Sequence, residues 1–276
     1  MKQHIVNLLT SSDSDARRLA AEELGTCGTD DTISALAAAL WDESKGVRDA
    51  ATRSLCMHDG TKVAQAIVDL IRDENIVTRN LIGELLLSWG KSSVQAIVPY
   101  LQDQSCDVRK FAMDILGLVG NAELIPDMLP LLNDADENVV LAAVEALGNL
   151  GNKEALPHLI RTFEGQEITR TFVAEAIGKI GSNDACEFLV ITLQEELGKE
   201  TRDALLMYAV IEALGMCGND FALKLLQDHV LKVEGKLRNV MLQSMVLISE
   251  RLQKRIQFSN IVKQDLINAF QSEEGI

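Results

Sequence analysis

The sequence predicts an all-α fold, a right-handed α-solenoid of about seven helix pairs followed by a C-terminal helical cap. Three observations predict it. A unit of about 31 residues recurs along the chain, apolar positions inside each unit follow helical spacing, and glycine recurs where each unit ends. Hydrophobic residues make up 47% of the 276 residues and aromatic residues only 4%. The core is therefore built from Leu, Ala, Ile and Val, which favours helices.

The repeat is clearest when the units are aligned on the position that Arg109 occupies. Successive counterparts follow at steps of 31, 31, 30, 31, 30 and 37 residues. The aligned positions are Arg17, Arg48, Arg79, Arg109, Val140, Arg170 and Met207. Positions three and seven after each are apolar, and this spacing places them on one face of a helix. We therefore expect the second helix of each unit to bury that face.

Helix ends are marked in every unit. Four residues before the aligned position stands a residue that can cap a helix, except in the sixth unit, where Gln166 stands. Eleven residues after it stands glycine, shifted by one to Gly60 in the second unit, as suits a left-handed helix stop. The predicted second helices lie near 14–25, 45–56, 76–88, 106–117, 137–148, 167–178 and 204–215.

All four prolines fall in the predicted first helices, such as 153–163 in the sixth unit. Pro99 and Pro130 hold the same place, four residues before Asp103 and Asp134. Proline inside a helix removes a hydrogen bond and kinks the backbone. We expect kinked first helices in these two units.

The pattern resembles the HEAT family, in the short form that phycobilin lyase subunits also have. The residues that carry it are "KGVRDAATRSL" (45–55), "DVRKFAMDILGLVGN" (107–121) and "NVVLAAVEALGNLGNKEALPHLI" (138–160). The resemblance extends over residues 1 to about 235 and implies one repeat domain over 1–276. Its repeats would lie near 1–28, 29–60, 61–90, 91–120, 121–151, 152–181 and 182–218, with the cap at 219–276.

The resemblance also implies a polar ladder between stacked repeats. The family carries an acidic residue shortly before the arginine, and here it stands six residues before the aligned position. The acidic column is Asp42, Asp73, Asp103 and Asp134, and the basic column is Arg17, Arg48, Arg79, Arg109 and Arg170. We interpret the ladder as structural. Val140 and Met207 interrupt it, so the resemblance implies a looser stack there.

Charge and cysteine content restrict the function. The chain carries a net charge of −15, which disfavours nucleic acid and anionic membranes, because both bind clustered Lys and Arg. The five cysteines are widely spaced and form no Cys-x-x-Cys motif, so we expect reduced, buried thiols. No signal-peptide pattern opens the chain, and no apolar run reaches about eighteen residues. A cytoplasmic protein is the expectation.

No catalytic, metal or cofactor site is expected from the motifs. HEAT enzymes that resemble deoxyhypusine hydroxylase hold iron with His-Glu pairs, whereas His4, His58, His158 and His229 are followed by other residues. The recurring Gly-x-x-Gly follows a helix, whereas a phosphate-binding loop follows a strand. No nucleophile-elbow motif is present.

One polar column remains unexplained by the fold. Position five after the aligned residue points away from the core and is acidic in six of seven units. These residues are Glu22, Glu84, Asp114, Glu145, Glu175 and Glu212; the apolar Leu141 and Tyr208 stand in the neighbouring column. We expect an acidic ribbon on the concave face, with both apolar side chains exposed beside it. The alternative is a solvated face that binds nothing.

This ribbon predicts a non-catalytic scaffold or adaptor that binds another protein through a basic or amphipathic segment. Two alternatives stay open: a phycobilin-lyase-like helper that handles a chromophore protein, and a regulatory module of a bacterial signalling system. The segments 236–258 and 260–270 read as two further helices. They either close the stack or dock onto a partner.

Overall fold

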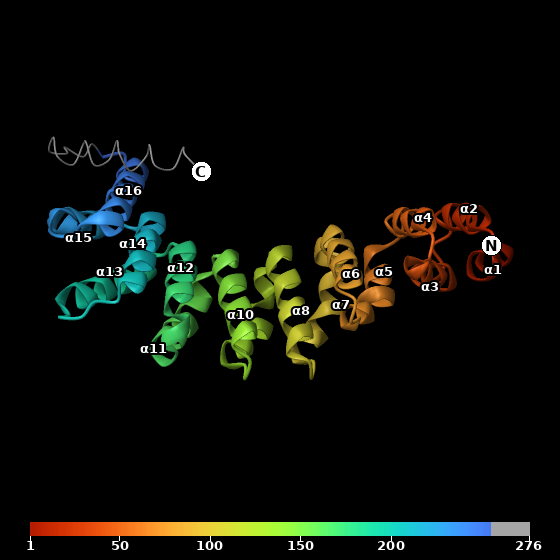
Figure 1. Cartoon of the computed structure of the whole chain (residues 1–276), viewed down its shortest axis with the longest axis horizontal. Helices are drawn as coiled ribbons and strands as arrows, with labels where there is room; N and C mark the ends of the chain where they lie inside the picture. The colour runs from red at the N-terminus through yellow and green to blue at the C-terminus, as the bar shows by residue number, and fades with distance from the viewer. Residues whose placement is uncertain (255–276) are drawn as a thin grey trace. The chain divides into compact units, whose positions relative to one another are not determined.

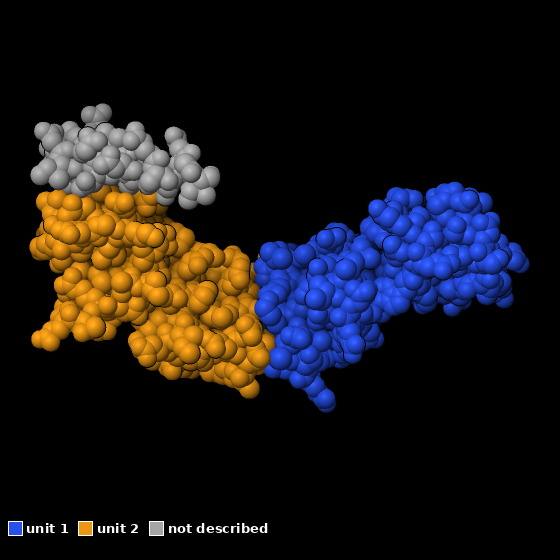
Figure 2. Space-filling view, in the orientation of Figure 1, with its two compact units in different colours: residues 1–119 blue, residues 120–276 orange. Residues whose placement is uncertain are grey.

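The computed structural model describes residues 1–254, and all regular structure in that range is helical. The chain forms two compact units, Met1–Val119 and the part that begins at Gly120 (Figure 2). In unit 1 the α-helices are α1 (Lys2–Thr10), α2 (Ser14–Leu24), α3 (Asp30–Ala38), α4 (Lys45–Leu55), α5 (Gly60–Ile67), α6 (Ile76–Ser88), α7 (Val94–Ile97) and α8 (Cys106–Val119).

Unit 2 continues the same alternation of first and second helices (Figure 1). Its α-helices are α9 (Ile125–Met128), α10 (Glu137–Leu150), α11 (Leu156–Gly165), α12 (Arg170–Ile180), α13 (Asn183–Gly198), α14 (Ala204–Cys217), α15 (Asp220–His229) and α16 (Gly235–Arg251). The second helices stack in sequence order, α10 on α12, α12 on α14 and α14 on α16. The predicted all-α stack of helix pairs is confirmed.

The capping residues explain where the second helices begin. The side chains of Asp136 and Asp203 accept hydrogen bonds from free backbone N–H groups at the starts of α10 and α14. Gln166 makes no such bond, and a 3₁₀ turn at Glu167–Thr169 precedes α12. The sixth second helix therefore begins at Arg170, three residues later than its predicted start.

Several first helices change from an α-helix to a 3₁₀ helix before they end, and proline accounts for only some of these changes. Pro99 and Pro130 lie at the second residue of the 3₁₀ segments Val98–Gln102 and Leu129–Asn133, as the kink prediction requires. The same change from α to 3₁₀ occurs without proline at Ala39–Trp41 and Val68–Arg72.

Glycine has two roles in unit 2. Gly151 and Gly181 end α10 and α12 in the left-handed conformation, with φ of 62° and 67°. The left-handed prediction is wrong for Gly218, whose φ is −56°, and in unit 1 for Gly28 and Gly60, neither of which has a positive φ. Gly178, inside α12, permits a close helix contact, because a Cβ there would lie 2.8 Å from the Cα of Ala213 on α14. Glycine at this place keeps the second helices close together.

The helices α15 and α16 form a further pair with the same contacts as the repeats before them. Arg238 Nε donates to the Val233 carbonyl, as Arg170 Nε donates to the Phe163 carbonyl. Ser244 Oγ donates to the Ile211 carbonyl one repeat earlier. Residues 219–251, assigned to the cap from the sequence, thus continue the repeat. The predicted helix at 260–270 and the end of 236–258 lie outside the described residues.

The acidic residues of the ladder shape the turn before each second helix. In each of the four, Oδ1 accepts the backbone N–H two residues further on; these bonds join Asp42 to Ser44, Asp73 to Asn75, Asp103 to Ser105, and Asp134 to Asp136. The arginines Arg48 and Arg109 donate to the backbone carbonyl six residues earlier, that of Asp42 and of Asp103.

Two of the acidic ladder residues, Asp42 and Asp103, form ion pairs between repeats in unit 1. Arg17 Nε lies 2.7 Å from Asp42 Oδ2, and both side chains are about nine-tenths buried. Asp103 is paired with Arg72, which lies outside the predicted basic column, at 2.6 Å. The Arg72 guanidinium also stacks over the Tyr100 ring, 4.6 Å from its centre. The pairing thus depends on which side chain reaches the carboxylate, not on the column alone.

The Arg17–Asp42 pair gives a pH-dependent stability. The guanidinium of Arg17 hydrogen-bonds Asp42 and lowers the pKa of that carboxyl. A carboxyl with a lowered folded-state pKa stabilises the fold above its unfolded pKa of about 3.9, and the contribution is lost as the pH falls through the folded value. Asp42→Asn should cost about 1.5–3 kcal/mol at pH 7.

This cost should shrink when denaturant unfolding is repeated below about pH 4. Glu43→Gln is the matched control, because Glu43 contacts the same arginine at 3.2 Å but is exposed. It should cost under about 1 kcal/mol. An Asp42→Asn cost that is equal at both pH values would contradict the assignment.

Candidate functional site

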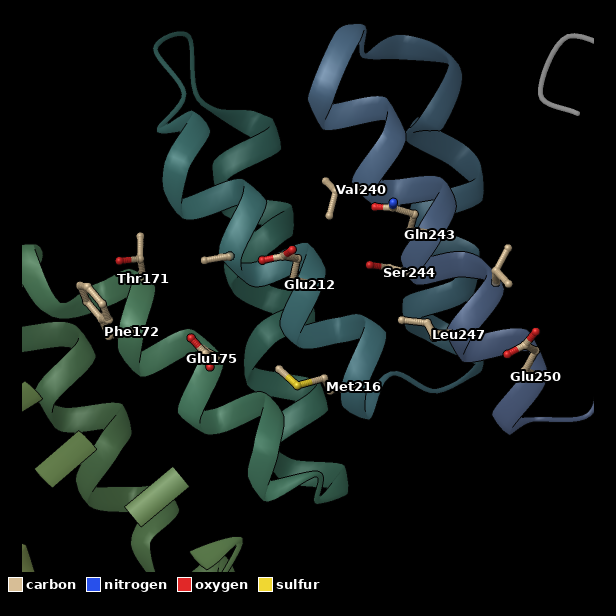
Figure 3. Close-up of a pocket in the computed structure, with 12 residues that line it drawn as sticks. Thr171, Phe172, Glu175, Glu212, Met216, Val240, Gln243, Ser244, Leu247 and Glu250 are labelled. Atoms are coloured by element: carbon tan, nitrogen blue, oxygen red, sulfur yellow. The ribbon is translucent and has the colours of Figure 1, made fainter. Parts of the chain in front are cut away.

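A groove of about 690 Å³ lies between the second helices α12, α14 and α16 of unit 2 (Figure 3). Its volume is in the range typical of ligand-binding clefts, about 300–1,000 Å³. The lining residues are Thr171, Phe172, Glu175, Ala209, Glu212, Met216, Val240, Gln243, Ser244, Val246, Leu247 and Glu250.

The groove exposes large apolar side chains to solvent. Phe172 on α12 is 52% exposed, Met216 on α14 is 40% exposed and Leu247 on α16 is 51% exposed. Each of the three helices contributes one of them (Figure 3). Side chains of this kind, gathered in one hollow, are typical of interaction surfaces.

Each helix also contributes one carboxylate to the groove, namely Glu175, Glu212 and Glu250 (Figure 3). Glu175 forms a 2.7 Å ion pair with Lys179, one turn along the same helix. Within residues 1–254, Glu212 and Glu250 form no ion pair. Among the described residues, two of the three groove carboxylates thus lack an ion-pair partner, and they lie beside apolar surface.

Glu212 is the carboxylate whose ionisation the groove affects most clearly. Burial raises its pKa, a hydrogen bond from Tyr208 lowers it, and the charge of Glu175 raises it again, so the net direction is upward. A cationic group bound near Glu212 would favour the ionised carboxylate and so lower its pKa.

The raised pKa predicts the effect of neutralising Glu212. A carboxyl with a raised folded-state pKa destabilises the fold when ionised, and its contribution becomes more favourable as the pH falls through the folded value. Glu212→Gln should therefore have a Tm at pH 7 no lower than that of the unaltered protein. A clear drop in Tm would show that the ionised carboxylate contributes to folding.

The predicted acidic ribbon is divided between the two units. In unit 1, Glu22 pairs with Arg18 and lies 3.6 Å from Arg53, and Asp114 pairs with Lys110 at 2.7 Å. Glu84 is exposed. Two of the three carboxylates in unit 1 are thus balanced by neighbouring cations.

In unit 2, Glu145, Glu175 and Glu212 are all exposed, on α10, α12 and α14. Tyr208 is 37% exposed, as expected, and lies beside Glu212. The expectation of an exposed Leu141 was wrong, because this side chain is half-buried on α10. The exposed apolar side chains beside the ribbon in unit 2 are instead those that line the groove, Phe172, Met216 and Leu247.

Phe172, Met216 and Leu247 were not predicted from the sequence as site residues. Phe172 lies two residues after the aligned position, and Met216 lies nine after it, as Leu247 does when Arg238 is taken as an eighth aligned residue. Positions two, five and nine are separated by three and four residues, so they share one face of a helix. These three residues could have been identified by comparing every position on that helix face, instead of positions one and five alone.

Among residues 1–254, no three or more His, Cys, Asp and Glu side chains are grouped so that they could hold a metal ion. His4 pairs with Glu23. Nor does any helix of the described part have the length and apolar character to cross a bilayer.

Cys186 and Cys217, which are far apart in the sequence, lie in contact. A hydrogen bond from Cys217 lowers the pKa of the buried Cys186 thiol below its usual range, and the positive charge of Arg251 acts in the same direction. The same bond, together with burial, raises the pKa of Cys217. The contact joins α13 to the end of α14 and lies outside the groove lining.

The family comparison matches the repeat described above. A family model for HEAT repeats matches residues 3–86 and 94–167. No curated protein matches the chain.

Similar solved structures include human deoxyhypusine hydroxylase in complex with glycerol, with 18% identity, coverage of 90% of this chain and 96% of that one, and a TM-score of 0.38. An engineered protein has 18% identity, coverage of 96% and 80%, and a TM-score of 0.45. YibA of E. coli has 17% identity, coverage of 89% and 92%, and a TM-score of 0.47.

Proposed function

The chain belongs to the HEAT repeat family, and we propose that it is a non-catalytic protein-binding scaffold or adaptor. The binding site in this proposal is the groove of α12, α14 and α16. The observation that carries it is the combination, in one hollow, of three half-exposed apolar side chains and three carboxylates.

The chemistry of the groove indicates the kind of partner. Its apolar side chains would lose contact with water on binding, which provides affinity at about 25 cal/mol per Å² of apolar surface before the costs of association. Its carboxylates would attract a basic segment and speed the encounter. A basic or amphipathic segment of another protein fits both, whereas nucleic acid and anionic membranes do not fit a chain of net charge −15.

The groove gives no support to a pigment-handling role. A tetrapyrrole carries propionates, which need basic groups, and flat rings, which pack against aromatic walls. The lining residues include no Lys or Arg, and Phe172 is their only aromatic member.

Affinity capture from a native extract tests the proposal. Glu212→Lys combined with Glu250→Lys should lose the proteins that the unaltered chain retains, because the groove charge is reversed. Glu154→Lys combined with Glu195→Lys is the matched control. It makes the same change of net charge at exposed positions of unit 2 outside the groove. Equal loss with both pairs, or with neither, would overturn the proposal.

A further inference from the structure

Three successive second helices each contribute the same two kinds of side chain to the groove, although the order of the two along the helix differs. Each helix presents one large apolar side chain and one carboxylate, three or four residues apart. The pairs are Phe172 with Glu175, Met216 with Glu212, and Leu247 with Glu250. Residues three or four apart share a helix face, so both groups of each pair lie toward the groove. A partner that follows the groove therefore meets the same two kinds of contact once per helix.

The distance between these contacts is set by helix packing. A Cβ on Gly178 would lie 2.8 Å from Ala213 Cα, and one on Gly215 would lie 3.0 Å from Ser244 Oγ. Helices in such close contact lie about 8–10 Å apart. Glu175 and Glu212 occupy the same position of neighbouring repeats, so their spacing follows this distance.

An α-helix comes closer to this spacing than an extended chain does. A helix rises about 1.5 Å per residue, so side chains seven residues apart share a face and lie about 10.5 Å apart. An extended chain rises about 3.3 Å per residue and alternates its faces. Its side chains on one face therefore lie about 6.6 or 13 Å apart, on either side of the required distance.

We infer that the occupant of the groove is an amphipathic helix of a partner protein, with Lys or Arg seven residues apart and large apolar residues between them on the same face. The basic groups lie against Glu175 and Glu212, and the apolar groups between them pack against Phe172 and Met216. An apolar group beyond the second basic residue packs against Leu247. This inference rests on the proposed function and specifies the partner's structure. Helix-in-groove binding of this kind uses anchors at i, i+3, i+4 and i+7.

Synthetic peptides test the inference against the full chain by fluorescence anisotropy. The first is about 18 residues long, beyond the ~12–15 residues below which isolated helices are marginal, with lysines seven apart and leucines between them on one face. The second has the same composition with the lysines on the opposite face. The third carries a central proline, which interrupts the helix. The first should bind at least about 10-fold more tightly than the other two.

The groove variants locate the binding. Glu175→Lys with Glu212→Lys should weaken the first peptide at least about 10-fold, and Glu154→Lys with Glu195→Lys should leave its Kd within about 2-fold. If the proline peptide binds as tightly as the first, the occupant is not a helix, and the inference fails while the proposed function stands. If no peptide binds but capture from extract still depends on the groove charges, the inference fails alone. If binding and capture both ignore the groove charges, both fail.

Discussion

Leu147→Ala is expected to lower the free energy of unfolding by about 2–5 kcal/mol. Leu147 lies on α10, seven residues after the aligned position, and its side chain is 0% exposed. Truncation removes its apolar contacts and leaves a cavity, because closely packed helices cannot collapse fully into the space. Denaturant unfolding followed by far-ultraviolet circular dichroism measures the change.

Leu205→Ala is the control for this truncation. Leu205 belongs to the same unit but is 78% exposed, so the same chemical change should cost under about 0.5 kcal/mol. A cost below about 1 kcal/mol for Leu147→Ala would contradict the packing of the repeat core.

Leu247→Asp should weaken a cationic partner about 10- to 100-fold, although it adds a fourth negative charge to the groove. The reason is that Leu247 presents apolar surface between α14 and α16, and burying a leucine contributes about 1.5–3 kcal/mol. If attraction between charges alone held the partner, the added carboxylate would tighten binding. The sign of the change therefore separates apolar anchoring from attraction between charges. Anisotropy with the first lysine–leucine peptide measures it.

Leu205→Asp is the matched control for this substitution. It introduces the same charge on an exposed leucine of α14 that does not line the groove. It should change the affinity by less than about 3-fold. Tighter binding by Leu247→Asp would show that apolar contact contributes little.

The second helices could be predicted because their signals are local. A capping side chain, apolar positions three and seven residues later and a terminal glycine all act within a few residues. Gln166, which stands at the capping position of the sixth unit, shows how much the helix start depends on a capping side chain. The one unit without a capping residue is the one whose second helix begins late, at Arg170.

Contacts between repeats could not be predicted in the same way. Arg72, outside the basic column, pairs with Asp103, since the partner is decided by side-chain reach across two packed repeats. Cys186 and Cys217 stand 31 residues apart in the sequence and touch because α13 packs on α14. The division into units falls between Val119 and Gly120, whereas the looser places were expected at Val140 and Met207. Both of those side chains are buried in unit 2.

The sequence predicted the acidic residues of the candidate site but not its apolar side chains. The sequence shows that position five stays acidic, but Lys110, Lys179 and Arg18 neutralise several of these residues locally. The apolar part of the groove appears only when α16 is recognised as a further second helix, because Leu247 and Glu250 complete it. Packing between repeats, not the pattern within one repeat, forms the hollow.

Photo-crosslinking in a native extract tests the central claim most directly, namely that the groove of α12, α14 and α16 is where this protein binds a partner. A photoreactive phenylalanine analogue would replace Phe172 in the groove or, as the matched control, Phe221 on α15, which is 77% exposed and lies outside the groove lining. The probe at Phe172 should crosslink a protein that the probe at Phe221 does not. That crosslink should disappear when Glu212→Lys and Glu250→Lys are added. A crosslink at Phe172 that survives charge reversal, or one found only at Phe221, would contradict the claim.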